Sequence, residues 1–336
     1  MTQLVSVEPN AEVAEWDRMV GHATNASFCQ TSTWGSVCER AFPRCRAAAR
    51  LYRFDDGVEV LVPGMVETAA KGAIRAFRSV FPSDSGGMIG SAPLSGQHID
   101  AIAADLKNAG FASVLIYESP FSVRREMPGF EMLSDFTHVL ALTDGIDGVM
   151  RRMKYQERQS LRRAERCGVT IVERCDEQGV EQAYRLYKLS AERWGEKTTW
   201  LRPMELLRAA VEIGGQDVKL RLAMLGDVPI GAEVDYFHDT LGAVAWRAFD
   251  YEYRSCHPNV ALFVASAIES CDRGLSYLDM GPSAGLPGLE TMKDRYGAVR
   301  VGFRVWQWEH PAFKAYARGR KGFDRAQAAV RAATRR

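Results

Sequence analysis

The 336-residue chain lacks several features that would point to a metal, a membrane or a disulfide framework. Its seven cysteines are an odd number, are widely scattered, and include no C-x-x-C pair or zinc-ligand spacing, which favours reduced thiols. No run of about 18 apolar residues occurs, and the first residues show no basic stretch followed by an apolar core. We therefore expect a cytoplasmic protein without a metal centre or a membrane-inserted segment.

The chain also lacks a net charge of either sign, because 43 basic residues nearly cancel 42 acidic ones. A polycation that coats nucleic acid or anionic lipid is thereby excluded, so any such binding must be local. What the chain does have is 46% apolar residues, a value typical of globular proteins. Its length suffices for two domains, each large enough to bury a core of its own.

The first half of the chain alternates predicted helices and strands. Helical spacing predicts helices over residues 11–21, 31–42 and 97–109. A glycine-bearing turn at 55–57 separates two apolar runs, which is typical of a β-hairpin. Residues 81–96 are rich in glycine, serine and proline, so we expect a long loop there.

The second half begins with a basic helix and continues into a sheet. The pattern predicts one long helix over 148–167, closed by Gly168 in a left-handed cap. Two further helices, at about 176–193 and 202–213, lead to three consecutive strands that form an antiparallel meander.

The two halves echo each other in pattern. Residues 51–66 and 221–237 each read as a strand, a turn and a strand, and residues 106–117 and 270–280 each read as a helix end, a glycine and a buried strand. A duplicated α/β unit explains this echo. Coincidence is the alternative, since hairpins and helix–strand joints are common.

A candidate anion site lies between Arg254 and Asn259, immediately before a predicted helix. Pro258 in the first turn leaves the neighbouring N–H groups and the positive end of the helix dipole directed into the loop, and Arg254 adds a guanidinium. Every helix has such an end, however, and most are capped by water or side chains. Both interpretations stay open on these residues alone.

Two basic stretches stand out in the otherwise neutral chain. Four basic residues of the predicted helix share one face, namely Arg151, Lys154, Arg158 and Arg162. A second basic stretch runs from Lys314 to the end of the chain. Each can be a strip that contacts a phosphate backbone or simply a solvated surface.

Three carboxylates are candidates for acid–base work. Asp279 ends a predicted strand, where a base could act on an attacking amine, and Glu233 and Asp235 project from one face of a meander strand. The alternative for each is a helix cap or an arginine pair. Residues 281–285 spell G-x-S-x-G, but the neighbouring prolines argue against the nucleophile elbow of a serine hydrolase.

Taken together, these motifs resemble the GNAT acyltransferase superfamily and, within it, the Fem-type branch of tandem-GNAT transferases. The stretches that carry the resemblance are RQSLRRAERCGVTIV, YEYRSCHPNVALFVASAIESCDRGLSYLDMGPS and GLETMKDRYGAV. The matching features are Arg254 with Pro258 and Asn259, then Asp279 with Gly281, then Lys293 with Tyr296 and Gly297. The match spans about residues 145–308 and is weaker before that, where residues 28–35 and the glycines at 86 and 87 also resemble the family.

The resemblance implies an α/β (α+β) fold with two GNAT-like domains, each a mixed, largely antiparallel sheet flanked by helices. We expect these domains at residues 1–143 and 144–309. A basic C-terminal helix at 310–336 is expected to pack back on the first domain.

The resemblance also implies an amide-forming acyltransferase that moves an aminoacyl group from aminoacyl-tRNA to an amine, such as a peptidoglycan precursor or a peptide-like metabolite. No cofactor is implied. Lys293 corresponds to a family lysine that stabilises substrate phosphate or the developing oxyanion, and Asp279 or a bound water is expected to receive the amine proton. Expected substrate contacts are Arg158, Gln30, Trp34, Arg247, Arg254, Asn259 and Tyr251.

Two other functions remain in view. The Q/R-x-x-G-x-G/A loop of ordinary acetyl-CoA enzymes is missing, because residues 254–259 read RSCHPN. An acyl-CoA-dependent N-acyltransferase acting on a small amine or sugar is nevertheless the first alternative. The second is a non-catalytic tandem-GNAT protein that uses its basic helix as a docking surface.

Overall fold

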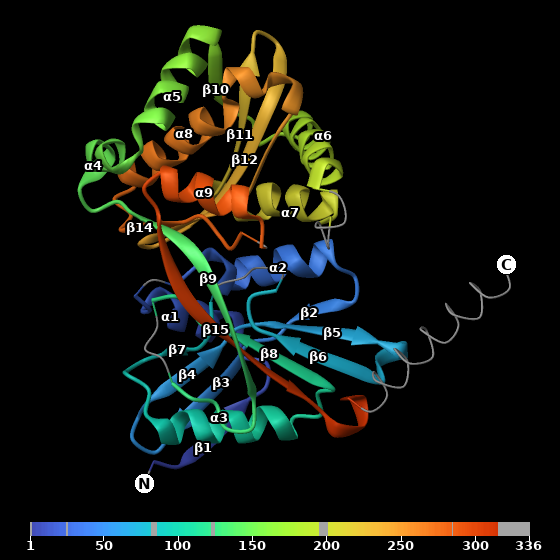
Figure 1. Cartoon of the computed structure of the whole chain (residues 1–336). Helices are drawn as coiled ribbons and strands as arrows, with labels where there is room; N and C mark the ends of the chain where they lie inside the picture. The colour runs from blue at the N-terminus through green and yellow to red at the C-terminus, as the bar shows by residue number, and fades with distance from the viewer. Residues whose placement is uncertain are drawn as a thin grey trace, which may run out of the picture.

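The computed structural model describes residues 2–24, 26–81, 86–121, 125–194, 201–283 and 285–314 (Figure 1). The helices are α1 (Val13–Gly21), α2 (Ser32–Ala41), α3 (Gly96–Asn108), α4 (Gly145–Arg152), α5 (Tyr155–Cys167), α6 (Glu177–Trp194), α7 (Met204–Gly214), α8 (Pro258–Asp272) and α9 (Pro287–Arg295). Short 3₁₀ turns include η1 (Phe28–Gln30) and η5 (Tyr251–Cys256).

The strands come from both halves of the described chain. They are β1 (Leu4–Glu8), β2 (Cys45–Ala47), β3 (Arg50–Phe54), β4 (Glu59–Val62), β5 (Met65–Ala69), β6 (Ile74–Arg78), β7 (Ile89–Gly90), β8 (Ser113–Tyr117), β9 (Glu131–Ala141), β10 (Val169–Glu173), β11 (Val218–Leu225), β12 (Val228–His238), β13 (Leu241–Phe249), β14 (Tyr277–Asp279) and β15 (Val299–Glu309). The predicted mixed α/β class, with sheets that are mostly antiparallel and flanked by helices, is confirmed.

One continuous sheet runs through both lobes of the molecule, the first built mainly from α1–α3 and β1–β8 and the second mainly from α4–α9 and β10–β14. Its strand order is β10-β11-β12-β13-β14-β9-β15-β8-β6-β5-β2, and the long strands β9 and β15 cross between the lobes (Figure 1). A smaller sheet, β1-β3-β4-β7, belongs to the first lobe alone. The two lobes therefore share backbone hydrogen bonds as well as side-chain contacts.

The sharing of strands bears on the domain boundary expected after residue 143. β9 precedes that boundary yet pairs with β14 of the second lobe, and β15 follows it yet pairs with β8 of the first. The boundary stays a prediction. In the structure, a strand on each side of residue 143 pairs with a strand of the other lobe.

Each lobe contains the same strand–helix–strand unit. In the first lobe β6 and β8 are parallel and α3 connects them, and in the second β13 and β14 are parallel and α8 connects them. This repetition agrees with the predicted duplicated α/β unit. The strand that follows each unit, β9 or β15, lies in the shared centre of the sheet.

The single basic helix predicted over 148–167 is wrong, because the structure divides it into α4 and α5. Met153 and Lys154 adopt extended ψ angles of 132° and 147° at the junction, and the Lys154 N–H donates to the carbonyl of Arg295 at 2.8 Å. The break turns α5 away from α4, so the four basic residues do not share one helical face. Gly168 closes α5 at φ 83°, as predicted.

The loop expected over 81–96 contains a short strand that the sequence did not indicate. β7 pairs with β4 through Ile89, and Ser95 caps α3 by accepting a hydrogen bond from the N–H of His98 at 3.4 Å. Part of this segment, residues 82–85, lies outside the described residues.

The core consists of several apolar clusters, and the largest joins the two lobes. It packs Phe28 and Trp34 of the first lobe against Tyr236 and Leu206 of the second. Along its edge, Arg40 of α2 pairs with Glu205 of α7 at 2.8 Å. The lobes are thus held by buried apolar area, which dominates such interfaces energetically.

Three remaining expectations concern the membrane, the cysteines and the C-terminus. Within the described residues, no helix has the length and hydropathy needed to cross a bilayer. All seven cysteines are free thiols. Of the expected C-terminal helix, residues 315–336 lie outside the described residues, whereas the N–H of His310 donates to the carbonyl of Ala112 in the first lobe at 2.9 Å.

Candidate functional site

The sheet opens at the point where β13 and β14 part. The two strands pair only from Leu241 to Ala243, whereas β13 continues to Phe249. The chain after β14 instead turns away at Gly281, whose φ of 72° favours glycine. This opening contains a cavity of about 300 Å³ that is lined by residues of both lobes.

Lys293 lies in the wall of this cavity with only 4% of its surface exposed. It projects from α9, a helix that begins at Pro287 because proline at the first turn needs no N–H partner. Its ammonium donates to the carbonyls of Gly281 at 2.7 Å and Pro282 at 3.0 Å. The positive charge is therefore fixed at the opening of the sheet by two backbone dipoles.

Asp279 lines the same cavity at the end of β14 and is 3% exposed. One carboxylate oxygen accepts hydrogen bonds from the hydroxyl of Thr137 and from the N–H of Gly281, the latter at 2.9 Å. Thr137 comes from β9, which lies next to β14 in the sheet. Three elements thus orient the carboxylate, and charge-assisted contacts of this kind are stronger than neutral ones.

His138 is a second titratable group close to the lysine. It is fully buried on β9, and its Nε2 lies 3.5 Å from a carboxylate oxygen of Asp294. Burial, followed by the positive charge of Lys293, lowers the pKa of His138 below its ordinary value. This lowered pKa favours the neutral imidazole, and Lys293 is the cation on this side.

The cavity also has an aromatic lining. Tyr236 of β12 lies 5.3 Å from the ring of Phe28 and 5.1 Å from that of Trp34, measured between ring centroids. Tyr187 of α6 stacks on Trp246 of β13 at 4.9 Å. All five rings line the cavity, and Phe28 and Trp34 belong to the first lobe.

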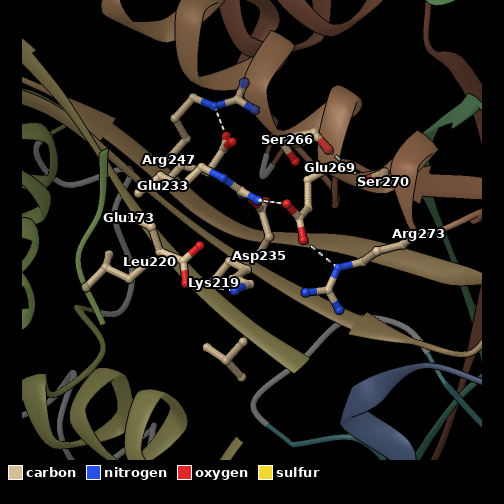
Figure 2. A network of polar contacts seen from close by, with 12 residues as sticks. Glu173, Lys219, Leu220, Glu233, Asp235, Arg247, Ser266, Glu269, Ser270 and Arg273 are labelled. Carbon is tan, nitrogen blue, oxygen red and sulfur yellow. Dashed lines mark hydrogen bonds and ion pairs between the residues drawn. The ribbon is translucent and has the colours of Figure 1, made fainter. Parts of the chain in front are cut away.

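A layer of buried charges supports the wall beside α8 (Figure 2). Arg247 of β13 pairs with Glu233, and Arg221 of β11 pairs with Asp235, both carboxylates being fully buried on β12. Burial and the neighbouring Glu233 raise the pKa of Asp235 to about 8. Since Arg247 also lines the cavity, the layer fixes one polar side chain of the site.

Glu233 and Asp235 are thus arginine-paired, which is the structural alternative that the sequence left open for them. Figure 2 shows Ser266 and Ser270 of α8 facing this layer. Small hydroxyl side chains there leave room for the paired arginines between the helix and the sheet. Neither carboxylate lines the cavity.

A second, smaller hollow of about 170 Å³ lies at the start of α8 and contains Arg254 and Asn259. His257 precedes the helix with a φ of 49°, and Pro258 occupies the first turn. Met292 lines both this hollow and the main cavity, so the two are adjacent.

Tyr251 lies at the edge of this region and is 53% exposed. The guanidinium of Arg254 sits 4.7 Å from the centroid of its ring, and that of Arg193 sits 5.1 Å away. Such stacking fixes the arginines at the surface, where they remain accessible to an anion.

Two other predicted contacts lie elsewhere. The amide of Gln30 donates to the carbonyl of Gly87 at 3.0 Å and accepts from the N–H of Ser27 at 3.0 Å, so it organises the loop behind the cavity. Arg158 donates to the carbonyls of Met150, at 3.2 Å, and Met153, thereby capping α4. Neither residue lines the two hollows, and their roles in binding stay predictions.

The structure therefore gathers four of the predicted residues around one cavity: Lys293, Asp279, Trp34 and Arg247. Sequence reasoning missed Thr137, Tyr187, Arg202 and Tyr236, which line the same cavity. Strand alternation could have placed Tyr236 on the face opposite Asp235, but no motif marks the others. Among the described side chains, no group of three or more histidine, cysteine, aspartate or glutamate residues could hold a metal ion.

Comparisons with known proteins agree with this architecture. Residues 151–294 match the family model described as "Acetyltransferase (GNAT) domain". Among curated proteins, no sequence matches the chain. The crystal structure of FemX superposes with a TM-score of 0.65 at 12% identity and covers 89% of this chain and 97% of that one.

Two further solved structures share the arrangement across nearly the whole chain. L-PGS from Bacillus licheniformis has a TM-score of 0.54 at 15% identity and covers 90% of this chain and 93% of its own. The C-terminal domain of a putative lysylphosphatidylglycerol synthetase from Agrobacterium fabrum has a TM-score of 0.53 at 10% identity, covering 90% and 94%. At these identities the likeness establishes the fold alone.

Proposed function

We propose that this chain, which has the Fem-type tandem-GNAT fold, is an amide-forming transferase that moves an aminoacyl group from aminoacyl-tRNA to an amine acceptor. The observation that carries the proposal is the placement of Lys293 and Asp279 in one cavity at the opening of the sheet. A buried cation and a buried carboxylate there suit the two needs of acyl transfer. One need is to stabilise negative charge on the carbonyl oxygen, and the other is to accept a proton from the amine.

In this reaction the acceptor nitrogen attacks the ester carbonyl of the donor. A C–N bond forms, the C–O bond to the ribose breaks, and the ribose oxygen leaves as a hydroxyl after the proton lost by the amine has been passed on to it. Asp279, or a water beside it, takes the proton that the amine loses. Attack of an amine on an ester is favourable, so positioning supplies most of the rate and no covalent enzyme intermediate is needed.

Lys293 acts on the carbonyl oxygen as negative charge develops there. Its ammonium carries three N–H groups and is held by the backbone before the reaction begins, so little reorganisation is required.

The donor is proposed to approach from the start of α8. Arg254 and the first N–H groups of that helix offer contacts for a phosphate of the donor, and Met292 separates them from the reaction cavity. The acceptor is proposed to enter between the lobes and to bring its amine to the reaction cavity. The name lysylphosphatidylglycerol synthetase, borne by one structural neighbour, describes a product with an aminoacyl group, which supports an aminoacyl donor.

An acyl-CoA donor is the second candidate, favoured by the match of residues 151–294 to a GNAT acetyltransferase domain. Two measurements on the purified chain separate the candidates. Acetyl-CoA that raises the melting temperature, together with labelled amide formed from acyl-CoA, would favour the second. Labelled amide formed only from charged tRNA, at a rate that falls steeply with salt, supports the first.

The same assay tests whether the chain is an enzyme. A mixture of amines is offered with each donor, and products are sought by mass spectrometry. Binding of nucleic acid with no product from any charged tRNA or acyl-CoA would reject the transferase proposal and leave a binding protein.

A further inference from the structure

We infer that the acyl group transferred by this chain carries a bulky, uncharged, apolar or aromatic side chain rather than a small or a basic one. The inference rests on the proposed function and names the substrate class of the same cavity. It follows from the rings that line the cavity, from its size and from the charges around it.

The aromatic lining is built jointly by the two lobes. Phe28 and Trp34 come from the first lobe, and Tyr187, Tyr236 and Trp246 come from the second. Phe28, Trp34 and Tyr236 are at most 5% exposed and pack on one another, so the rings in this lining are held rigidly. Aromatic walls give a large apolar contact area, and ring pairs add a favourable geometry of their own.

The position of the carbonyl decides which part of the substrate meets these rings. If the carbonyl lies beside Lys293, the side chain of the acyl group is attached within two bonds of it and must occupy the same cavity. The acceptor needs to bring only its amine to this point. The cavity of about 300 Å³ is much larger than a methyl group or a glycyl residue requires, so small groups would leave most ring surface without contacts.

The charges of the lining disfavour a basic side chain. Three cationic residues, Arg202, Arg247 and Lys293, line the cavity against one carboxylate, Asp279. A lysyl or arginyl side chain would meet like charges and lose its water against the rings. An acidic side chain would also lose its water against the rings, and two of the three cations are already engaged, Arg247 by Glu233 and Lys293 by two backbone carbonyls. A neutral side chain avoids both costs.

The test compares donors that differ only in the acyl side chain. Purified wild-type chain is given tRNA charged with phenylalanine, leucine, glycine, glutamate or lysine, and in parallel phenylacetyl-CoA or acetyl-CoA. We expect kcat/KM for the phenylalanyl or leucyl donor, or for phenylacetyl-CoA, to exceed that for the small and charged donors at least tenfold. Preferred transfer of a glycyl, acetyl, glutamyl or lysyl group would overturn the inference and leave the proposed function intact.

Two variants test whether the preference for the large acyl group depends on the size and the aromatic lining of the cavity. Ala243→Leu narrows the cavity and is expected to lower the ratio of large-group transfer to glycyl or acetyl transfer at least tenfold. Trp246→Ala removes one aromatic wall and is expected to reduce the preference for the large group. Met132→Ala, which removes an apolar side chain that is 47% exposed outside the cavity, is the matched control and should leave the preference unchanged.

A binding measurement decides the inference even if no donor is turned over. Thermal shift is recorded with millimolar N-acetyl-phenylalaninamide, N-acetyl-glycinamide and N-acetyl-lysinamide. Stabilisation by the phenylalanine compound alone, lost in Ala243→Leu, supports the aromatic acyl site. Equal shifts for all three compounds, or a shift that survives Ala243→Leu, would contradict it.

Discussion

Lys293 and Asp279 owe their positions to contacts from several parts of the chain. Backbone carbonyls hold the ammonium, and a hydroxyl from β9 with an N–H from the turn after β14 holds the carboxylate. Each side chain is buried, so any water that reaches it comes through the cavity. A buried charge held in this way costs little reorganisation when the reaction begins.

Asp279→Asn is expected to slow amide formation by roughly 10-fold to 100-fold without abolishing it, because a bound water can take over the proton. The measurement is the single-turnover rate at saturating donor. Thr137→Val, which removes one hydrogen bond to the carboxylate and leaves its charge, serves as the matched control and should have a smaller effect. A rate equal to wild type in Asp279→Asn would argue against a role in proton transfer.

The loop after β6 approaches β8 so closely that one glycine is required. Gly87 has a φ of 112°, and a Cβ placed there would lie 2.6 Å from the carbonyl oxygen of Tyr117. Gly96, at the start of α3, has no positive φ, and a Cβ added to it would meet no atom within 4 Å. Replacing each glycine by alanine therefore distinguishes the effect of backbone strain from the effect of adding a methyl group.

Gly87→Ala is expected to lower the free energy of unfolding by about 2 kcal/mol or more, since it combines an unfavourable φ with a steric clash. Gly96→Ala is expected to be neutral or slightly stabilising. Urea unfolding followed by circular dichroism measures both variants. Equal stability of the two would show that the loop can relax around the added methyl group.

The elements themselves were largely predictable from the sequence, and the reasons are local. The Gly168 cap, the meander and the proline-initiated helix α8 each follow from residues within a few positions of the feature. The break between α4 and α5 was not predictable, because Lys154 is held by the carbonyl of Arg295, far away in the sequence.

The same distinction applies to the candidate site. Lys293 and Asp279 stand in motifs, and the structure places both in the lining of the cavity. Thr137 and Tyr236 belong to strands with no motif, and they reach the cavity only because the sheet brings β9 and β12 to its opening. Residues that reach the cavity only through strand pairing have no recognisable pattern in the neighbouring sequence.

At the scale of the whole molecule, the sheet shared through β9 and β15 should make the lobes unfold together. We expect coincident urea transitions by far-ultraviolet circular dichroism and tryptophan fluorescence. Leu140→Ala, at a fully buried position of β9, should shift both transitions equally and cost about 2–5 kcal/mol. Two separate transitions, or a shift confined to one probe, would show that the lobes are independent.

The buried charge layer makes stability depend on pH. The pKa of Asp235, about 8 when folded, exceeds its ordinary unfolded value, so the folded state binds this proton more tightly. The resulting stabilisation is fully present below about pH 4 and is lost as pH rises towards 8. Between these limits, the stability of wild type relative to Asp235→Asn should fall by up to about 1.4 kcal/mol per pH unit.

Urea unfolding of wild type and Asp235→Asn at pH 5, 6, 7 and 8 provides this comparison. The quantity to follow is the difference in free energy of unfolding between wild type and variant, and how this difference changes with pH. Its absolute size is less informative, because the variant also alters the partner of Arg221. A difference that stays constant, or that grows with pH, would contradict a raised pKa.

The most direct test of the account is the effect of Lys293→Met on the chemical step. The single-turnover rate of amide formation should fall about 100-fold, because a preorganised charge that stabilises the oxyanion is lost, whereas KM for the donor should change much less. Lys293→Arg, which keeps the charge, should recover part of the rate. A Lys293→Met protein that folds and transfers its acyl group at the wild-type rate would contradict the claim that this cavity performs acyl transfer through Lys293.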